Sequence, residues 1–173
     1  NDHYPDLVTV EGAWSVTAQD NLRVYMNVQD TVSSNRIFVD VTGTSGVNVK
    51  PGSTDPSRGT LVVALADINN DGNVDMVRGN YYHRLTSFVD HGDRCEVLLG
   101  DGQGHFTLAP NNGLHELGLI NTIGFSFLDY NRDGNIDLFI APWFKDYEAN
   151  IWEAGRLMKG NGDGTFTDVS AQA

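Results

Sequence analysis

The acidic stretch Asp67-Ile-Asn-Asn-Asp-Gly-Asn-Val-Asp75 is the most informative part of the sequence, because the chain repeats it almost unchanged as Asp129-Tyr-Asn-Arg-Asp-Gly-Asn-Ile-Asp137. A Gly-rich turn follows each copy, Gly100-Asp-Gly-Gln-Gly-His-Phe106 in one case and Gly160-Asn-Gly-Asp-Gly-Thr-Phe166 in the other. Both landmarks recur after about 60 residues, and two independent landmarks with one period indicate an internal repeat.

Short apolar segments flank these landmarks and predict four strands in each full repeat. The expected strands of the first full repeat are 61–66, 74–77, 96–99 and 105–108. Those of the second are 123–128, 136–140, 156–158 and 165–169. No segment has a sustained 3.6-residue apolar period, so helix is expected to be scarce. A single twisted four-stranded sheet cannot bury both of its faces, and the pattern therefore predicts an all-β protein, a β-propeller segment of four-stranded antiparallel blades.

The repeat divides the chain into a partial blade at 1–58 and two complete blades at 59–118 and 119–173. The first unit is partial because Asn1-Asp-His-Tyr-Pro-Asp6 aligns only with the end of an acidic loop, at Asn70–Asp75. Propellers close with about 4–8 blades, so the remaining blades are expected from the same or other chains. Open apolar blade faces and strand edges associate, and we therefore expect that this chain is not a free-standing monomer. The segment 45–59, rich in Gly, Ser, Pro and Thr, is interpreted as a surface connection.

The acidic loops are predicted to bind metal, because each presents oxygen donors at alternating positions and contains no His or Cys. The candidate ligands are Asp67, Asn69, Asp71, Asn73 and Asp75 in one loop, and Asp129, Asn131, Asp133, Asn135 and Asp137 in the other. The two residues at position 7 of the loops, Asn73 and Asn135, would contribute main-chain carbonyls. Many hard oxygens in a flexible loop favour Ca²⁺, and two Ca²⁺ sites are predicted.

An EF-hand and a metal-free turn are the two other interpretations of these loops. An EF-hand requires Glu at position 12, where this chain has Arg78 or Ile140, and helical rather than strand-like flanks. A metal-free turn would also use Asp, Asn and Gly. It is disfavoured because a turn does not require three carboxylates to converge and repel one another. The apolar residues at position 8, Val74 and Ile136, are expected to point inward and to attach each loop to its sheet.

An acidic loop before an apolar strand, followed by Gly-x-Gly-x-Phe, resembles the FG-GAP/VCBS repeat of integrin-α-type β-propellers. The segments Phe127–Phe139 and Gly160–Ser170 are similar in particular to bacterial relatives of cartilage acidic protein. The resemblance implies calcium loops on one face of a propeller and partner binding on the opposite face. It also implies an extracytoplasmic location, either secreted, at the cell surface or periplasmic.

Aromatic residues follow the strand after each acidic loop and are candidate ligand-binding residues: Trp14, Tyr81, Tyr82, Trp143 and Phe144. In the resembled fold these connections lie on the face opposite the calcium loops. Aromatic platforms there can stack on sugars or anchor a protein partner. The alternative is that these side chains pack between blades.

Composition excludes several classes of function. The formal net charge of −12 argues against nucleic-acid binding, and the apolar runs are too short to span a membrane. A single cysteine, Cys95, excludes an internal disulfide framework, and no catalytic motif such as Gly-x-Ser-x-Gly occurs. We therefore predict a non-catalytic, calcium-binding module for protein or glycan interaction or adhesion. The alternatives are an accessory propeller of a carbohydrate-active lyase or hydrolase, or a structural subunit of a larger extracytoplasmic assembly.

Overall fold

The structure is a computed structural model that describes residues 4–10, 22–48, 59–81, 94–118, 120–146 and 150–172. In these ranges the regular structure consists of β-strands and two short 3₁₀ turns, η1 (His115–Leu117) and η2 (Ser170–Gln172). The predicted all-β class is confirmed. None of the described helical segments is long and apolar enough to cross a membrane.

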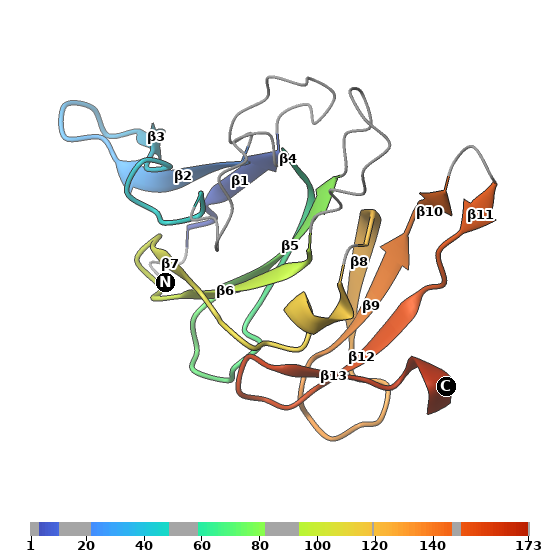
Figure 1. Cartoon of the computed structure of the whole chain (residues 1–173). Helices are drawn as coiled ribbons and strands as arrows, with labels where there is room; N and C mark the ends of the chain where they lie inside the picture. Colours follow the sequence, from blue (N-terminus) through green and yellow to red (C-terminus); the bar gives the residue numbers. More distant parts are fainter. Residues whose placement is uncertain are drawn as a thin grey trace.

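Three antiparallel sheets follow one another along the chain (Figure 1). The first contains β1 (Leu7–Val10), β2 (Leu22–Gln29) and β3 (Arg36–Asp40). The second contains β4 (Gly59–Ala66), β5 (Asp75–Tyr81), β6 (Glu96–Gly100) and β7 (Phe106–Leu108). The third contains β8 (Thr122–Leu128), β9 (Asp137–Pro142), β12 (Arg156–Gly160) and β13 (Phe166–Asp168). Neighbouring strands pair in chain order, and all eight strands predicted for residues 59–173 are confirmed.

A small hairpin between β9 and β12 was not predicted. It is a separate two-stranded sheet of β10 (Phe144–Asp146) and β11 (Ile151–Trp152). Figure 1 shows it at the end of the third sheet opposite the acidic loop. This placement follows from topology, because the acidic loop precedes β9 and the hairpin follows it.

The three sheets share one strand register. The residue after the last loop aspartate pairs with a residue of the next strand in the same way in each sheet: Leu7 with Tyr25, Met76 with Leu98, and Leu138 with Met158. Two residues beyond each of these partners, a backbone N–H donates to the aspartate at 2.8 Å: Asn27 to Asp6, Gly100 to Asp75, and Gly160 to Asp137. Asp6 therefore lies at the position that the alignment of its segment with Asn70–Asp75 predicts.

Two apolar cores lie between successive sheets. Leu22 and Val24 of the first sheet pack with Met76 and Leu98 of the second. The opposite face of the second sheet packs on the third, through a cluster that includes Val77, Val97, Leu138, Ile140 and Met158. Side chains alternate between the two faces of a strand, so each sheet can bury one face against each neighbour.

The start of the segment 45–59 is buried, contrary to its interpretation as a surface connection. Ser45 and Val47 are fully buried, and the Ser45 carbonyl accepts the Phe106 N–H at 2.7 Å. Arg78, which forms a buried ion pair with Glu96, also donates to the carbonyl of Val47. These contacts attach the connection to the second sheet, and residues 49–58 lie outside the described ranges.

Candidate metal-binding loops

The two acidic loops connect equivalent strands, β4 to β5 and β8 to β9, and have the same backbone form. Position 4 is left-handed in both, with φ of 60° at Asn70 and 59° at Arg132. Position 6 is also left-handed, with φ of 86° at Gly72 and 85° at Gly134. Glycine adopts this region without steric strain, which explains why the sharp turn requires it at position 6.

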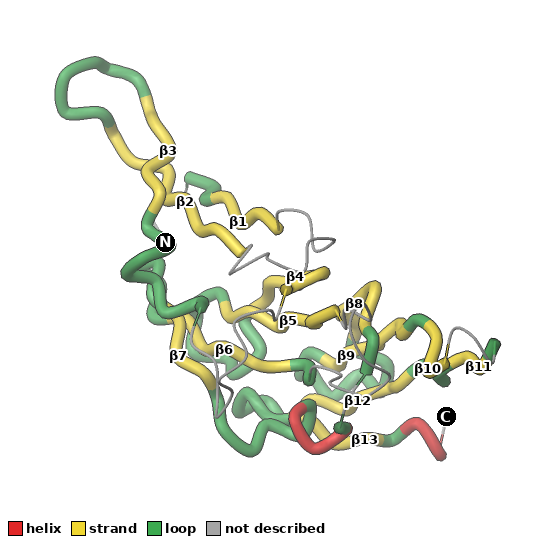
Figure 2. The backbone as a smooth tube through the Cα atoms, turned by 45° about the horizontal axis from the view of Figure 1, so that its top comes forward, coloured by secondary structure: helices red, strands yellow, loops and turns green. Residues whose placement is uncertain are grey.

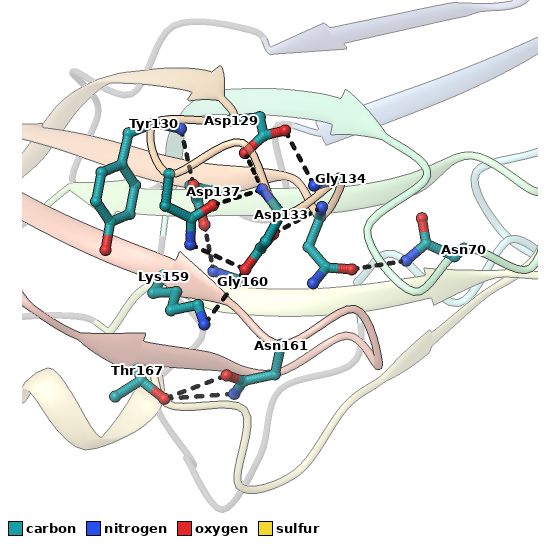
Figure 3. Close-up of polar contacts among 12 residues, drawn as sticks. Asn70, Asp129, Tyr130, Asp133, Gly134, Asp137, Lys159, Gly160, Asn161 and Thr167 are labelled. Carbon is teal, nitrogen blue, oxygen red and sulfur yellow. Dashed lines mark hydrogen bonds and ion pairs between the residues drawn. The ribbon is translucent and has the colours of Figure 1, made fainter.

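The first carboxylate of each loop organises the turn by accepting backbone N–H groups (Figure 3). Asp67 accepts from Asp71 at 3.1 Å and from Gly72 at 2.9 Å. Asp129 accepts from Asp133 and Gly134, both at 3.1 Å. Such local side-chain bonds are typical of Asx turns, so the short-range sequence is sufficient to form the loop.

The carboxylate at position 5 makes the same contacts in both loops. Asp71 accepts from the Asn73 backbone at 2.7 Å and Asp133 from the Asn135 backbone at 2.9 Å. The Asn side chain at position 3 donates to it at 2.9 Å in each case, from Asn69 to Asp71 and from Asn131 to Asp133. These hydrogen bonds lower the pKa of Asp71 and Asp133, with the backbone bond as the largest cause.

The last aspartate of each loop is fully buried at the start of the following strand. Asp75 accepts the Ile68 N–H at 3.0 Å and the Gly100 N–H at 2.8 Å, so it connects its own loop to the Gly-rich turn. Asp137 does the same with Tyr130 at 2.9 Å and Gly160 at 2.8 Å. Burial raises the pKa of Asp75, and the charges of Asp71 and Asp67 raise it further against the lowering effect of the two hydrogen bonds.

The donors suit a hard divalent cation. The three carboxylates of the first loop interact unfavourably, because Asp67 and Asp71 both oppose ionisation of Asp75. A bound cation would reverse that effect. Over the described ranges, no three His, Cys, Asp or Glu side chains are gathered into a preformed metal centre. The candidate shell therefore combines the carboxylates with Asn side-chain and main-chain oxygens, as Ca²⁺ accepts.

The side chains at position 7 lie against the Gly-rich turns. A Cβ atom on Gly102 would be 2.4 Å from Asn73 Oδ1, and one on Gly162 would be 2.4 Å from Asn135 Oδ1. A side chain at Gly102 or Gly162 would clash with the asparagine of the acidic loop, so each turn needs glycine at this contact. These glycines were not among the predicted site residues. Their recurrence at a similar distance behind each acidic loop, 27 residues after Asp75 and 25 residues after Asp137, was the signal that could have identified them.

The two loops differ in one charge contact. Lys159 Nζ lies 3.2 Å from Asp133 Oδ2 in the second loop, beside Gly160 (Figure 3). The equivalent position before Gly100 is Leu99, which carries no charge. Lys159 therefore forms an ion pair with one carboxylate oxygen of Asp133, a candidate metal ligand of the second loop.

The expectation that Val74 and Ile136 both point inward is wrong for Val74, which is 46% exposed. Ile136 is half-buried and packs on the core between the second and third sheets. In the first loop the inward residue is Ile68 at position 2, which is only 3% exposed. Ile68 is covered because its loop lies beside the third sheet, which the sequence of the loop alone does not indicate.

Two of the candidate aromatic residues belong to an exposed cluster at the β10–β11 hairpin. The rings of Trp143 and Phe144 are 6.0 Å apart, edge to face, and those of Phe144 and Trp152 are 3.8 Å apart. Trp143 is 43% exposed and Trp152 is 65% exposed. We call these three residues the aromatic cluster. Trp152 was not among the predicted residues, because the hairpin that brings it to Phe144 was not predicted.

The other candidates remain predictions. Trp14 and Tyr82 lie outside the described residues. Tyr81 ends β5, where it pairs with Gly59, and its side chain is not described. The aromatic cluster is therefore the part of the predicted ligand face that the described structure brings together.

Comparison with protein-family models gives no match to this chain. Comparison with curated proteins gives no match either.

Proposed function

We propose that this chain is a calcium-stabilised, non-catalytic segment of a β-propeller that binds a protein or glycan partner outside the cytoplasm. The observation that carries the proposal is that the two acidic loops make the same hydrogen bonds. Asp67 and Asp129 accept the backbone N–H groups of Asp71 and Asp133. The buried Asp75 and Asp137 accept those of Ile68 and Tyr130. The same oxygen-rich arrangement in both loops is better explained by one bound cation in each loop than by turn formation alone. A turn does not require carboxylates to converge.

The propeller part of the proposal is supported by the stacking of the sheets. β4 and β8, the first strands of the second and third sheets, lie against each other, and β1 lies against β4. Each sheet buries one face on the next, through the two apolar cores. Successive antiparallel sheets packed face to face in this way are the arrangement expected of blades.

Calcium would act mainly on structure. A cation shared by the carboxylates offsets their repulsion and holds a long loop against its sheet. Its binding to the folded state stabilises that state by mass action. Bound calcium would also neutralise part of the formal charge of −12, which reduces the electrostatic self-repulsion of the folded chain. A structural ion leaves the opposite end of each sheet free for a partner.

Lys159 provides a prediction that is specific to the second loop. Replacing Lys159 by leucine, the residue at the equivalent position of the second sheet, is expected to raise the calcium affinity of the second loop by roughly three- to tenfold. The reason is that the ammonium group competes with calcium for Asp133, and its exposure keeps the effect moderate. Isothermal titration calorimetry with calcium measures it, and the first loop is the internal control. Equal affinities before and after the substitution would contradict the prediction.

The aromatic cluster is the candidate partner surface, because exposed aromatic rings stack on sugars and anchor protein contacts. The test is binding of the calcium-loaded chain to arrayed glycans, with immobilised extracellular-matrix proteins as a second array. Replacing the 65% exposed Trp152 by alanine should weaken any specific binding about tenfold or more. The matched control is Val32→Ala, at a residue that is 93% exposed in the turn between β2 and β3. Equal binding by both variants would exclude the cluster as the partner surface.

A further inference from the structure

The Gly-rich turn of the third sheet, residues 160–166, contacts both acidic loops, and we call it the bridging turn. It follows β12 and is attached to the second loop through Gly160, whose N–H donates to Asp137 at 2.8 Å. The Asn135 side chain of the same loop lies against Gly162, where a Cβ atom would be 2.4 Å from Asn135 Oδ1. These contacts attach the turn to the acidic loop of its own sheet.

The bridging turn also contacts the first loop, which belongs to the neighbouring sheet. The Asn70 side chain donates to Asn135 Oδ1 at 3.2 Å (Figure 3) and to the carbonyl of Gly162 at 3.4 Å. A Cβ atom on Gly164 would lie 3.7 Å from Asn69 Cβ, so the end of the turn packs beside a second residue of the first loop. One short turn therefore connects the two candidate metal sites.

This packing of a Gly-rich turn on the preceding sheet occurs twice in the chain. A Cβ atom on Gly164 would be 3.0 Å from Leu99 Cδ2, and one on Gly104, in the first Gly-rich turn, would be 2.8 Å from Met26 Sδ. Met26 and Leu99 are equivalent in the shared strand register. The contact between the bridging turn and the first loop is therefore part of the regular packing of one sheet on the next.

An apolar contact supports the polar one. Ile68, at position 2 of the first loop, is buried in the core between the second and third sheets, and Ile136, at position 8 of the second loop, packs against the same core. Figure 2 shows these sheets side by side, with β4 and β5 next to β8. The two loops are therefore held close together by the packing of their sheets, and the Asn70 bonds do not have to bring them together.

Asn70 and Asn135 lie next to candidate ligands. Asn70 occupies position 4, between the candidate ligands Asn69 and Asp71, and Asn135 occupies position 7, where the main-chain carbonyl is the candidate ligand. A cation held by positions 3 and 5 of the first loop would fix the backbone on both sides of Asn70. The Asn70 side chain would then hold Asn135 in place, and less entropy would be lost when the second loop binds its own ion.

We propose that the two calcium sites are coupled through the bridging turn, so that calcium in one loop raises the affinity of the other, with Asn70 as the positioning residue of the link. The inference rests on the proposed function, because it takes both loops as calcium sites. Coupling between two sites is reciprocal, so each ion favours the other by the same factor. A hydrogen bond between neutral groups contributes modestly, and we expect a factor of about three to ten.

The experiment compares the calcium affinity of both loops together with that of each loop alone, by isothermal titration calorimetry. Asp129→Ala reports the first loop alone, and Asp67→Ala reports the second. The overall affinity of the unsubstituted chain for two ions should exceed the product of these two affinities about three- to tenfold. In chains that also carry Asn70→Gly, this ratio should fall to about one. Glycine keeps the left-handed backbone of position 4 and removes only the side-chain donor.

Arg132→Gly is the matched control. Arg132 is the exposed residue at position 4 of the second loop and has the same left-handed backbone, with φ of 59°. The same substitution at the same loop position, away from the bridging contact of Asn70, should keep the ratio at about three to ten. Loss of its charge changes the affinity of the second loop in every chain that carries it, and this change cancels in the ratio.

Hydrogen exchange measured by mass spectrometry gives a second readout that does not depend on an affinity. In the Asp129→Ala chain, calcium can bind only in the first loop. It should still slow amide exchange in the bridging turn, which belongs to the other sheet, by about twofold or more. Asn70→Gly should abolish this effect, while circular dichroism shows that the variants are folded.

Two results would overturn the coupling and leave the proposed function intact. One is an overall affinity equal to the product of the single-loop affinities. The other is a ratio that Asn70→Gly leaves unchanged, because Asn70 would then not carry the link. A chain that binds no calcium would instead refute the proposed function, and the coupling with it.

Discussion

Replacing Asp75 by alanine is expected to lower the free energy of unfolding by about 2–5 kcal/mol in calcium-free buffer. The buried carboxylate accepts the N–H groups of Ile68 and Gly100, and alanine leaves both donors buried without these acceptors. Each buried donor without a partner costs about 1–3 kcal/mol, and relief of the repulsion from Asp67 and Asp71 offsets a part. Urea denaturation followed by circular dichroism measures the loss.

The chain offers matched controls for this substitution. Asp137→Ala should have a similar effect, because Asp137 makes the same two bonds in the third sheet. Asp75→Asn retains one acceptor and should cost less than Asp75→Ala. Asp101→Ala, in an exposed turn, should change stability least. A loss below about 1 kcal/mol for Asp75→Ala would show that its two hydrogen bonds do not hold the loop.

Removal of calcium is expected to lower the melting temperature of the wild-type chain. At a free calcium concentration of 100 times Kd, each site contributes about 2.7 kcal/mol. For a chain of 173 residues this corresponds to roughly 5–10 °C for each site. Differential scanning calorimetry with calcium and with excess EGTA provides the measurement.

A double variant, Asp67→Ala with Asp129→Ala, is the control for chelation. It removes the first candidate ligand of both loops, so its melting temperature should not respond to EGTA. Magnesium should restore less stability to the wild-type chain than calcium, because it requires a stricter octahedral shell. A wild-type melting curve that is unchanged by EGTA would contradict calcium binding by these loops.

The turn chemistry of this protein could be predicted from short stretches of sequence. Asp67 and Gly72 form their turn through bonds that span no more than five residues. The strands of the second and third units could be predicted for the same reason, since short β-prone segments bounded by turn residues define them. The candidate metal ligands are therefore readable from the sequence, because the oxygen donors of each loop are near neighbours in the chain.

The errors occurred where a residue's surroundings depend on distant segments. Val47 is buried because Met76 and Leu98 of the second sheet pack around it, although its own neighbours in sequence resemble a surface loop. Trp152 joins the aromatic cluster because a short hairpin, Phe144 to Trp152, brings it onto Phe144. Two-residue strands have too little pattern to predict from sequence.

The strands, the acidic loops and their repetition follow from the sequence, because they depend on local hydrogen bonding and on alternation along a strand. Which copy of each equivalent residue is buried follows only from the packing of the sheets. Ile68 and Val77 are covered by the third sheet, whereas Tyr130 and Phe139 at the same repeat positions are exposed. The residue types are apolar or aromatic in both copies, and burial is a property of the neighbouring sheet rather than of the segment.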